Sequence, residues 1–246
     1  MKKLGKRIGA AFAVILAAAM LTLSVGAADL AKAEAKAAEL KELGLFRGVS
    51  DTDFDLNREP TRVEALVMLI RTLGEEQAAL GGSFSHPFTD VPSWANSYVG
   101  YAYQKGLTNG VSATEFGSGN ASAAMYVTFM LRALGYSDAA GDFKWDNPFD
   151  LARKAGIVTD AVNLSKFLRA DVVEVSYAAL SAKLKDGSKT LSERLIAAGV
   201  FPAEKLKTAN LGGVTEVGKV EGPKQIFKPE PIYEKPVQPD DPAIGE

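Results

Sequence analysis

The stretch that decides the fold is residues 88–107, FTDVPSWANSYVGYAYQKGL. Trp94, Tyr98 and Ala102 recur within it at intervals of four residues, which places them on one face of a helix. A side-chain cap for the start of this helix is available from Asp90 or Ser93. The stretch therefore predicts an amphipathic helix that packs one face against another element.

The same arrangement occurs elsewhere in the chain, so the sequence contains an internal repeat. Gly106 follows the helix where a left-handed C-terminal residue belongs, and Gly44 stands 62 residues before it. Segment 70–74, IRTLG, matches segment 131–135, LRALG, at an offset of 61. Segment 149–156, FDLARKAG, can be laid over 99–106, VGYAYQKG, and marks a third, more diverged copy. Gly48 and Phe54 of the first copy also correspond to Gly110 and Phe116 of the second.

Each copy consists of a helix, a glycine stop, a loop and a second helix. The second helix of the first copy carries a broad apolar stripe, formed by Val63, Leu66, Val67, Ile70 and Leu73. One helix pair of this size cannot bury such a stripe alone, whereas several copies packed together can. We therefore predict an all-α fold in which three helix–loop–helix repeats share an apolar centre.

Composition excludes several classes of function. The chain has 28 Lys and Arg against 30 Asp and Glu, a net charge of −2, which argues against nucleic acid as a partner. It has no cysteine and one histidine, His86 in a loop, so thiolate and two-histidine metal sites are excluded. Asp51, Asp53 and Asp55 alternate as in a calcium loop, but the glycine and glutamate that such a loop requires are missing. We expect no metal, no cofactor and no catalytic residue.

The two ends of the chain differ from the repeats. Residues 1–7 are basic, residues 8–23 are almost wholly apolar, and a small residue, Ala27, ends the segment. This pattern predicts a secretory signal peptide, 1–27, the alternative being an uncleaved membrane anchor; after cleavage we expect no integral membrane contact. Residues 207–246 hold six of the 11 prolines, which predicts a disordered tail that could meet a protein partner.

The motif Thr61-Arg62-Val63-Glu64 opens the second helix of the first copy. Thr-x-x-Glu before an apolar run is typical of a capping box, which accounts for Thr61 and Glu64 as structural residues. Arg62 then points outward from the helix start, either into solvent or onto an anionic ligand. Copy two has SAAM at 122–125 and lacks the arginine, whereas copy three has LRAD at 168–171 and keeps it.

Together these motifs resemble the S-layer homology (SLH) family. The run FTDVPSWA at 88–95, with the helix, glycines and Phe116 that follow it, resembles the opening of an SLH repeat. The segment TRVE at 61–64 resembles the TRAE motif of that family. The resemblance implies a pseudo-trimeric α-helical bundle that attaches non-covalently to bacterial cell-wall glycan. That glycan is usually a secondary cell-wall polysaccharide carrying a pyruvylated amino sugar.

The resemblance also implies ligand-binding residues in grooves between the repeats. Arg62 is the first candidate for contact with an anion and Arg169 the second, since a guanidinium can bind a carboxylate through two parallel hydrogen bonds. Asp90, Trp94 and Gly110 match positions of the repeat opening and loop. For Trp94 the alternative is packing in the core on its helix face. Because copy two lacks the arginine, at most one or two grooves are fully equipped.

These observations lead to one organisation and three candidate functions. The leading function is anchoring at the cell surface through an acidic polysaccharide of the cell wall. The second is a structural or adaptor protein with decayed repeats, and the third is a cell-wall hydrolase. The predicted organisation is a signal peptide at 1–27, repeats at 28–80, 81–140 and 141–206, the last degenerate with a terminal helix, and a Pro-rich tail at 207–246.

Overall fold

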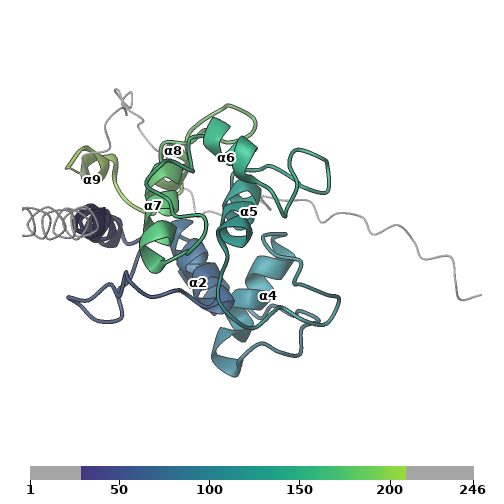
Figure 1. Ribbon diagram of the computed structural model, residues 1–246. Helices are drawn as coiled ribbons and strands as arrows, with labels where there is room; N and C mark the ends of the chain where they lie inside the picture. The colour runs from purple at the N-terminus through teal and green to yellow at the C-terminus, as the bar shows by residue number, and fades with distance from the viewer. Residues whose placement is uncertain (1–28, 209–246) are drawn as a thin grey trace, which may run out of the picture.

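The computed structural model describes residues 29–208, and within this range the chain is helical, with isolated bridges and no sheet (Figure 1). The all-α prediction is confirmed. The predicted signal peptide and residues 209–246 of the predicted tail lie outside the described residues, whereas the tail's first two positions close the last helix. The elements are a helix at 29–42, α2 (Arg62–Thr72), α3 (Glu76–Gly81), the short 3-10 helix η1 (Ser93–Ala95), α4 (Asn96–Gln104), α5 (Ala123–Ala133), α6 (Phe149–Lys154), α7 (Arg169–Ala179), α8 (Leu191–Ala197) and α9 (Ala203–Thr208).

The centre of the fold is a set of three helices, α2, α5 and α7, each of which contacts the other two (Figure 1). Each spans 11 residues. Their inward faces are apolar and fully buried, as at Ile70 on α2, Met130 on α5 and Val173 on α7. The burial of these faces removes from water the stripe that one helix pair could not cover by itself.

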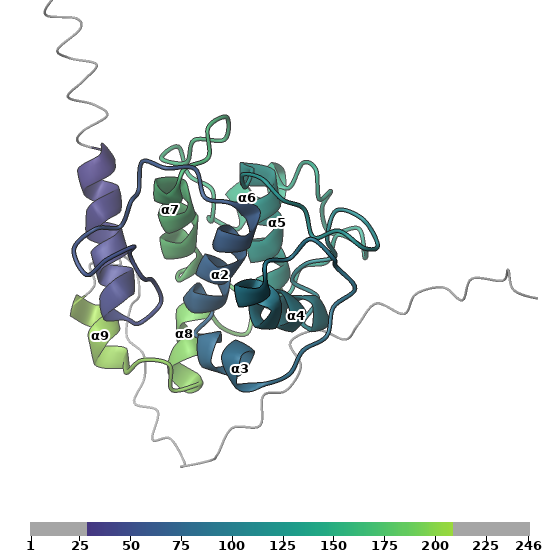
Figure 2. The same cartoon turned by 90° about the horizontal axis from the view of Figure 1, so that it is seen from below.

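Shorter helices cover this centre from outside (Figure 2). Helix α4 packs against α2 and α3, and α6 packs against α5. The helix at 29–42 is tied to α7 by an ion pair between Lys36 and Glu174. At its C-terminal end it lies next to α9 (Figure 2), where the Nζ of Lys205 donates to the carbonyl of Glu42 at 3.1 Å. Within residues 29–208 no helix combines the length and apolar character that crossing a membrane requires.

Local backbone geometry supports the predicted repeat. Gly44, Gly106 and Gly156 end their helices with φ of 78°, 69° and 76°, a conformation that favours glycine. The loops that follow in the first two copies close with matching bonds. The amide of Val49 donates to the carbonyl of Asp53 at 2.9 Å, and the amide of Val111 to that of Glu115 at 2.8 Å. The number of repeats remains a prediction.

Backbone bonds also join neighbouring copies at the starts of the central helices. The amide of Arg62 donates to the carbonyl of Gly119, and the amide of Arg169 donates to the carbonyl of Arg58, each at 2.9 Å. Position 58 precedes 119 by the same 61 residues that relate the two IRTLG-like segments. Two seams are therefore built alike, one between α2 and the loop before α5, the other between α7 and the loop before α2.

One expectation about the deciding stretch is wrong. Tyr98 and Ala102 are buried as the spacing predicts, but Trp94 is 57% exposed, so it does not pack in the core. The reason is that Trp94 lies in η1, ahead of α4, where the backbone has not yet taken the α-helical period. Neither Asp90 nor Ser93 caps this helix, since no side chain caps η1 or α4.

Candidate functional site

A cavity of about 490 Å³ opens at the seam between α2 and the second copy, and we call it the Arg62 cavity. Its volume lies within the range of about 300–1,000 Å³ that is typical of small-ligand sites. It is formed by the start of α2, the loop before α5, one face of α5 and the segment that follows α5. Its lining comprises Arg62, Asn109, Gly110, Val111, Ser112, Ser122, Ala124, Met125, Thr128, Phe129, Arg132, Asp138 and Trp145.

The capping box at Thr61 is confirmed, and it fixes Arg62 as the first residue of α2. The amide of Glu64 donates to Oγ1 of Thr61 at 3.2 Å, and the amide of Thr61 donates to the Glu64 carboxylate at 2.8 Å. These bonds satisfy two amides that a helix start leaves without intrahelical partners. Arg62 is thus the first residue of a firmly capped helix, and its side chain leaves α2 toward the neighbouring copy.

The guanidinium of Arg62 lies between two aromatic rings of that neighbouring copy. Its central carbon is 5.0 Å from the ring centroid of Phe116 and 5.4 Å from that of Phe129. Such cation–π contacts stabilise the charge without using up its hydrogen-bond donors. The Nε atom is buried and has no hydrogen-bond partner among the described residues.

Burial, together with the nearby Arg132, lowers the pKa of Arg62 to about 10. The side chain is therefore still a cation at neutral pH. A buried donor without an acceptor is costly, and more so when it is charged. The site accordingly favours an anionic acceptor that could take up the free donors of Arg62.

The second arginine of the cavity, Arg132, is fully engaged. Its Nε and Nη2 donate to the two carboxylate oxygens of Asp138 at 2.9 and 2.7 Å, and its Nη1 donates to the carbonyl of Leu107 at 3.2 Å. The one carboxylate of the lining thus serves Arg132, and the negative charge that acts on Arg62 is that of Asp90, outside the lining. Arg132 was not among the predicted site residues, although its place in the repeated LRALG segment was a signal that could have found it.

Asp90 and Gly110 shape the loop beneath Arg62. The amides of Phe116 and Gly117 donate to the Asp90 carboxylate at 2.7 and 2.8 Å. Desolvation opposes ionisation of Asp90, but these bonds outweigh it and lower its pKa. Gly110 lines the cavity with φ of 74°, and a Cβ there would lie 2.4 Å from a ring carbon of Phe88. Asp90 therefore positions the loop, while only Gly110 of the two faces the cavity.

The structure brings a different tryptophan to the cavity from the predicted one. Trp94 is not part of the lining, whereas Trp145, from the segment before α6, is. Trp145 is 67% exposed. Its backbone carbonyl accepts a hydrogen bond from Oγ1 of Thr128 at 3.0 Å. The sequence signal was the aromatic pair Phe143 and Trp145, which stands where the third copy should open.

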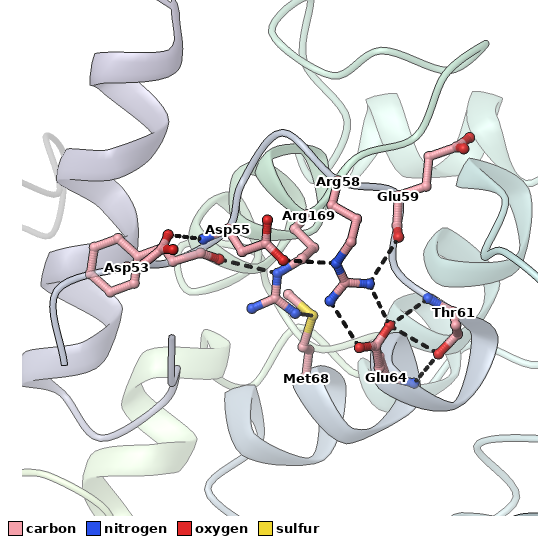
Figure 3. A network of polar contacts seen from close by, with 9 residues as sticks. Asp53, Asp55, Arg58, Glu59, Thr61, Glu64, Met68 and Arg169 are labelled. Carbon is pink, nitrogen blue, oxygen red and sulfur yellow. Dashed lines mark hydrogen bonds and ion pairs between the residues drawn. The ribbon is translucent and has the colours of Figure 1, made fainter. Parts of the chain in front are cut away.

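The second predicted arginine, Arg169, is in a closed environment (Figure 3). Arg169 is 5% exposed. Its burial lowers its pKa, and the positive charge of the nearby Arg58 lowers it further. Its Nε donates to the carbonyl of Phe54 at 3.1 Å, and its guanidinium carbon lies 5.8 Å from the ring centroid of Phe46. A contact of 3.5 Å joins Nη1 to the sulfur of Met68. Arg169 does not line the Arg62 cavity.

A charged network closes the seam beside Arg169. Arg58 donates to both oxygens of Glu64 at 2.9 Å and to Asp55 at 2.7 Å (Figure 3). The bond from Arg58 lowers the pKa of Glu64 to about 2, and the same contacts raise the pKa of Arg58. Glu64 thus serves the capping box on one side and this ion pair on the other.

Two lesser features complete the description of the polar side chains. Within residues 29–208 no group of three or more acidic or histidine side chains is arranged to hold a metal ion. His86 lies in a loop, as predicted, where its Nδ1 accepts from the amide of Phe88 at 3.1 Å and its Nε2 is 3.2 Å from Oδ1 of Asn96. This ring therefore orders its own loop.

Fold and cavity define a helical protein whose candidate site lies at the seam between repeated units. Residues 87–118 match the family model of the S-layer homology domain. The chain belongs to the S-layer homology family, as the motifs of the repeat opening predict. The matched residues contain Gly110 and the loop that supports Arg62.

Three curated proteins are similar to the chain. A cell surface protein of Thermoanaerobacter kivui is 32% identical over 180 residues, which is 68% of this chain and 23% of that protein. A middle cell wall protein of Brevibacillus brevis is 33% identical, and a surface layer protein of Brevibacillus choshinensis is 34% identical, each over 100 residues and 39% of this chain. The chain spans 10% and 9% of these two, so it covers less than a quarter of the relatives' length.

These similarities confirm the predicted location. The chain is a secreted protein of the bacterial cell surface, and its family and relatives support a general role in cell-surface anchoring. All three relatives are named as surface or cell-wall proteins.

Proposed function

We propose that the chain holds itself on the cell wall by binding an acidic polysaccharide in the Arg62 cavity. The observation that carries this proposal is the partly buried cation of Arg62, a residue that lines a cavity of ligand size. A carboxylate on the sugar, such as the ketal acid of a pyruvylated amino sugar, would place a negative charge against this guanidinium.

The chemistry of the lining suits such a ligand. A carboxylate can accept two parallel hydrogen bonds from one guanidinium, and the bonds gain strength in a partly desolvated site. Asn109, Ser112 and Ser122 offer neutral donors and acceptors for sugar hydroxyls. Asp138 is paired with Arg132, so no carboxylate of the lining is left to pair with Arg62.

We propose a single working site in the described part of the chain. The seam at Arg169 is filled, because that arginine is buried and bonded to backbone. The corresponding position at the start of α5 is Ala123, which is buried and carries no charge. The remaining seam, at Arg62, combines a cation with open space.

The test is retention on purified cell-wall sacculi. Arg62→Gln removes the charge but keeps the side-chain carbons as far as Cδ and a polar end, and we expect it to abolish most of the retention. Arg153→Gln on α6 is the matched control, because Arg153 is exposed and does not line the cavity. Equal retention of wild type and Arg62→Gln would contradict the proposal.

The polysaccharide itself is tested by pretreating the sacculi with mild acid, which hydrolyses ketals and releases acid-labile wall polymers. We expect wild-type retention to fall to the level of Arg62→Gln. Undiminished retention on treated sacculi would assign binding to peptidoglycan or to protein instead.

A structural or adaptor role is the second candidate, and the closed state of the Arg169 seam favours it. In that case the chain would fold normally but leave the wall in the washes, with or without Arg62. A wild-type protein that is not retained on sacculi would support this alternative.

A further inference from the structure

The feature that the proposed function does not use is the exposed indole of Trp145. Five large apolar side chains are exposed in the described range, and Trp145, at 67%, is the most exposed of them. It also lines the same cavity as Arg62. Large exposed apolar groups beside a concave site usually mark a binding surface.

The backbone that carries this indole is held in place. Oγ1 of Thr128, on α5, donates to the carbonyl of Trp145 at 3.0 Å. The amide of Asn147 donates to the carbonyl of Lys144 at 3.0 Å, which closes a tight turn around the tryptophan. The backbone of Trp145 is therefore held beside the cavity, and its exposed ring contributes little to the stability of the fold.

The second and third copies carry different residues two positions after a phenylalanine. Trp145 follows Phe143 by two residues, as Asp90 follows Phe88 in the second copy. Asp90 uses its carboxylate to close its own loop. Trp145 has no carboxylate with which to close a loop in this way, and it lines the Arg62 cavity.

We propose that Trp145 is a stacking platform for the pyranose ring of the ligand whose acidic group pairs with Arg62. The inference rests on the proposed function and deepens it. The flat apolar face of an indole suits the C–H face of a sugar ring, whereas an anion without a ring gains nothing from it. Arg62 selects for negative charge, and Trp145 selects for a sugar that carries it.

A matched set of variants tests this platform. The chain has two tryptophans, both exposed, and only Trp145 lines the cavity. On sacculi we expect Trp145→Ala to weaken binding about five- to tenfold, the loss of one aromatic contact. Trp145→Phe should keep most of the affinity, and Trp94→Ala should bind as wild type. All three should retain the wild-type melting temperature.

The outcomes separate this inference from the proposed function. Wild-type binding by Trp145→Ala, with binding lost in Arg62→Gln, would overturn the platform and leave the anionic site intact. Binding unaffected by either substitution would overturn both. A loss as large in Trp94→Ala as in Trp145→Ala would also overturn the platform.

Fluorescence gives an independent readout. In Trp94→Phe the only tryptophan is Trp145, and purified wall polysaccharide should shift its emission to the blue and protect it from acrylamide. In Trp145→Phe, where Trp94 is the reporter, emission should stay constant. Sodium pyruvate, a carboxylate without a sugar ring, should leave Trp145 unprotected. Full protection by pyruvate, or none by polysaccharide that binds, would contradict the platform.

Discussion

Two arginines that occupy the same place in the repeat have opposite surroundings. Arg62 and Arg169 each open an 11-residue helix, and each amide donates to a carbonyl of the neighbouring loop at 2.9 Å. Arg169 is then buried on the carbonyl of Phe54. Arg62 instead lines a cavity, and its buried Nε has no hydrogen-bond partner among the described residues. Backbone placement is thus shared, and the facing loop decides whether the cation is structural or available.

The loops that face the two arginines differ in the residue at one corresponding position. Asp55 and Gly117 stand 62 residues apart, and both have positive φ, 50° and 101°. Asp55 accepts from Arg58 and so helps to close the seam at Arg169. Gly117 has no side chain, and a Cβ there would lie 3.3 Å from Cδ of Arg62. Glycine at this position therefore leaves no side chain between the loop and Arg62.

The largest effect that this comparison predicts is on stability. Arg169→Ala removes a buried charged hydrogen bond and the packing around it, so we expect the free energy of unfolding to fall by about 3 kcal/mol. For a domain of this size the melting temperature should drop by about 6–12 °C. Arg62→Ala should change stability by less than about 1 kcal/mol. Thermal unfolding followed by circular dichroism measures both; equal losses would contradict the contrast.

The next effect is on binding and tests the difference between the loops. Gly117→Asp places a carboxylate beside Arg62, as Asp55 places one beside Arg58, and we expect it to reduce retention on sacculi at least tenfold. Gly117→Ala is the control, because it imposes the same backbone strain without a charge. If the alanine variant loses as much binding as the aspartate variant, strain rather than charge is responsible.

The pH dependence of binding should follow the charge of Arg62. Its pKa of about 10 lies below the ordinary arginine value, so the cation persists through pH 9 and is lost as the pH rises through 10. A carboxylate is already ionised across this range. We expect constant retention from pH 7 to 9 and a steep loss above pH 10, with far-UV circular dichroism as the check that the fold persists. Retention that is unchanged at pH 11 would argue against a guanidinium–carboxylate contact.

The smallest expected effect concerns the cap that starts α2. Thr61→Ala removes the acceptor for the amide of Glu64 and should cost about 1 kcal/mol of stability. Thr61→Ser keeps the hydroxyl and should be close to neutral. Urea unfolding distinguishes the two, and a neutral alanine variant would mean that the Arg58–Glu64 pair alone orders the helix start.

Local patterns of the sequence predicted local structure well. The capping box at Thr61 and the glycine at 106 each depend on a few neighbouring residues, and the structure confirms both. The outward direction of Arg62 followed from the same cap. These features require only the helical period and the geometry of helix ends.

Features that depend on distant segments could not be predicted in this way. Arg169 is buried because the carbonyl of Phe54 lies beside it, 115 residues earlier in the chain. Trp94 matched the family pattern and the helical period, yet the 3-10 turn before α4 leaves it exposed and outside the cavity. Trp145 lies at the cavity because of the conformation of an irregular loop, which hydrophobic periodicity cannot predict.

The central claim is that one seam binds and that Arg62 is its cation. Calorimetric titration with a purified, pyruvylated fragment of wall polysaccharide tests it directly on wild type and Arg62→Gln. We predict one site per chain for wild type and no measurable heat of binding for the variant. Two or three sites per chain, or unchanged affinity in Arg62→Gln, would contradict the account.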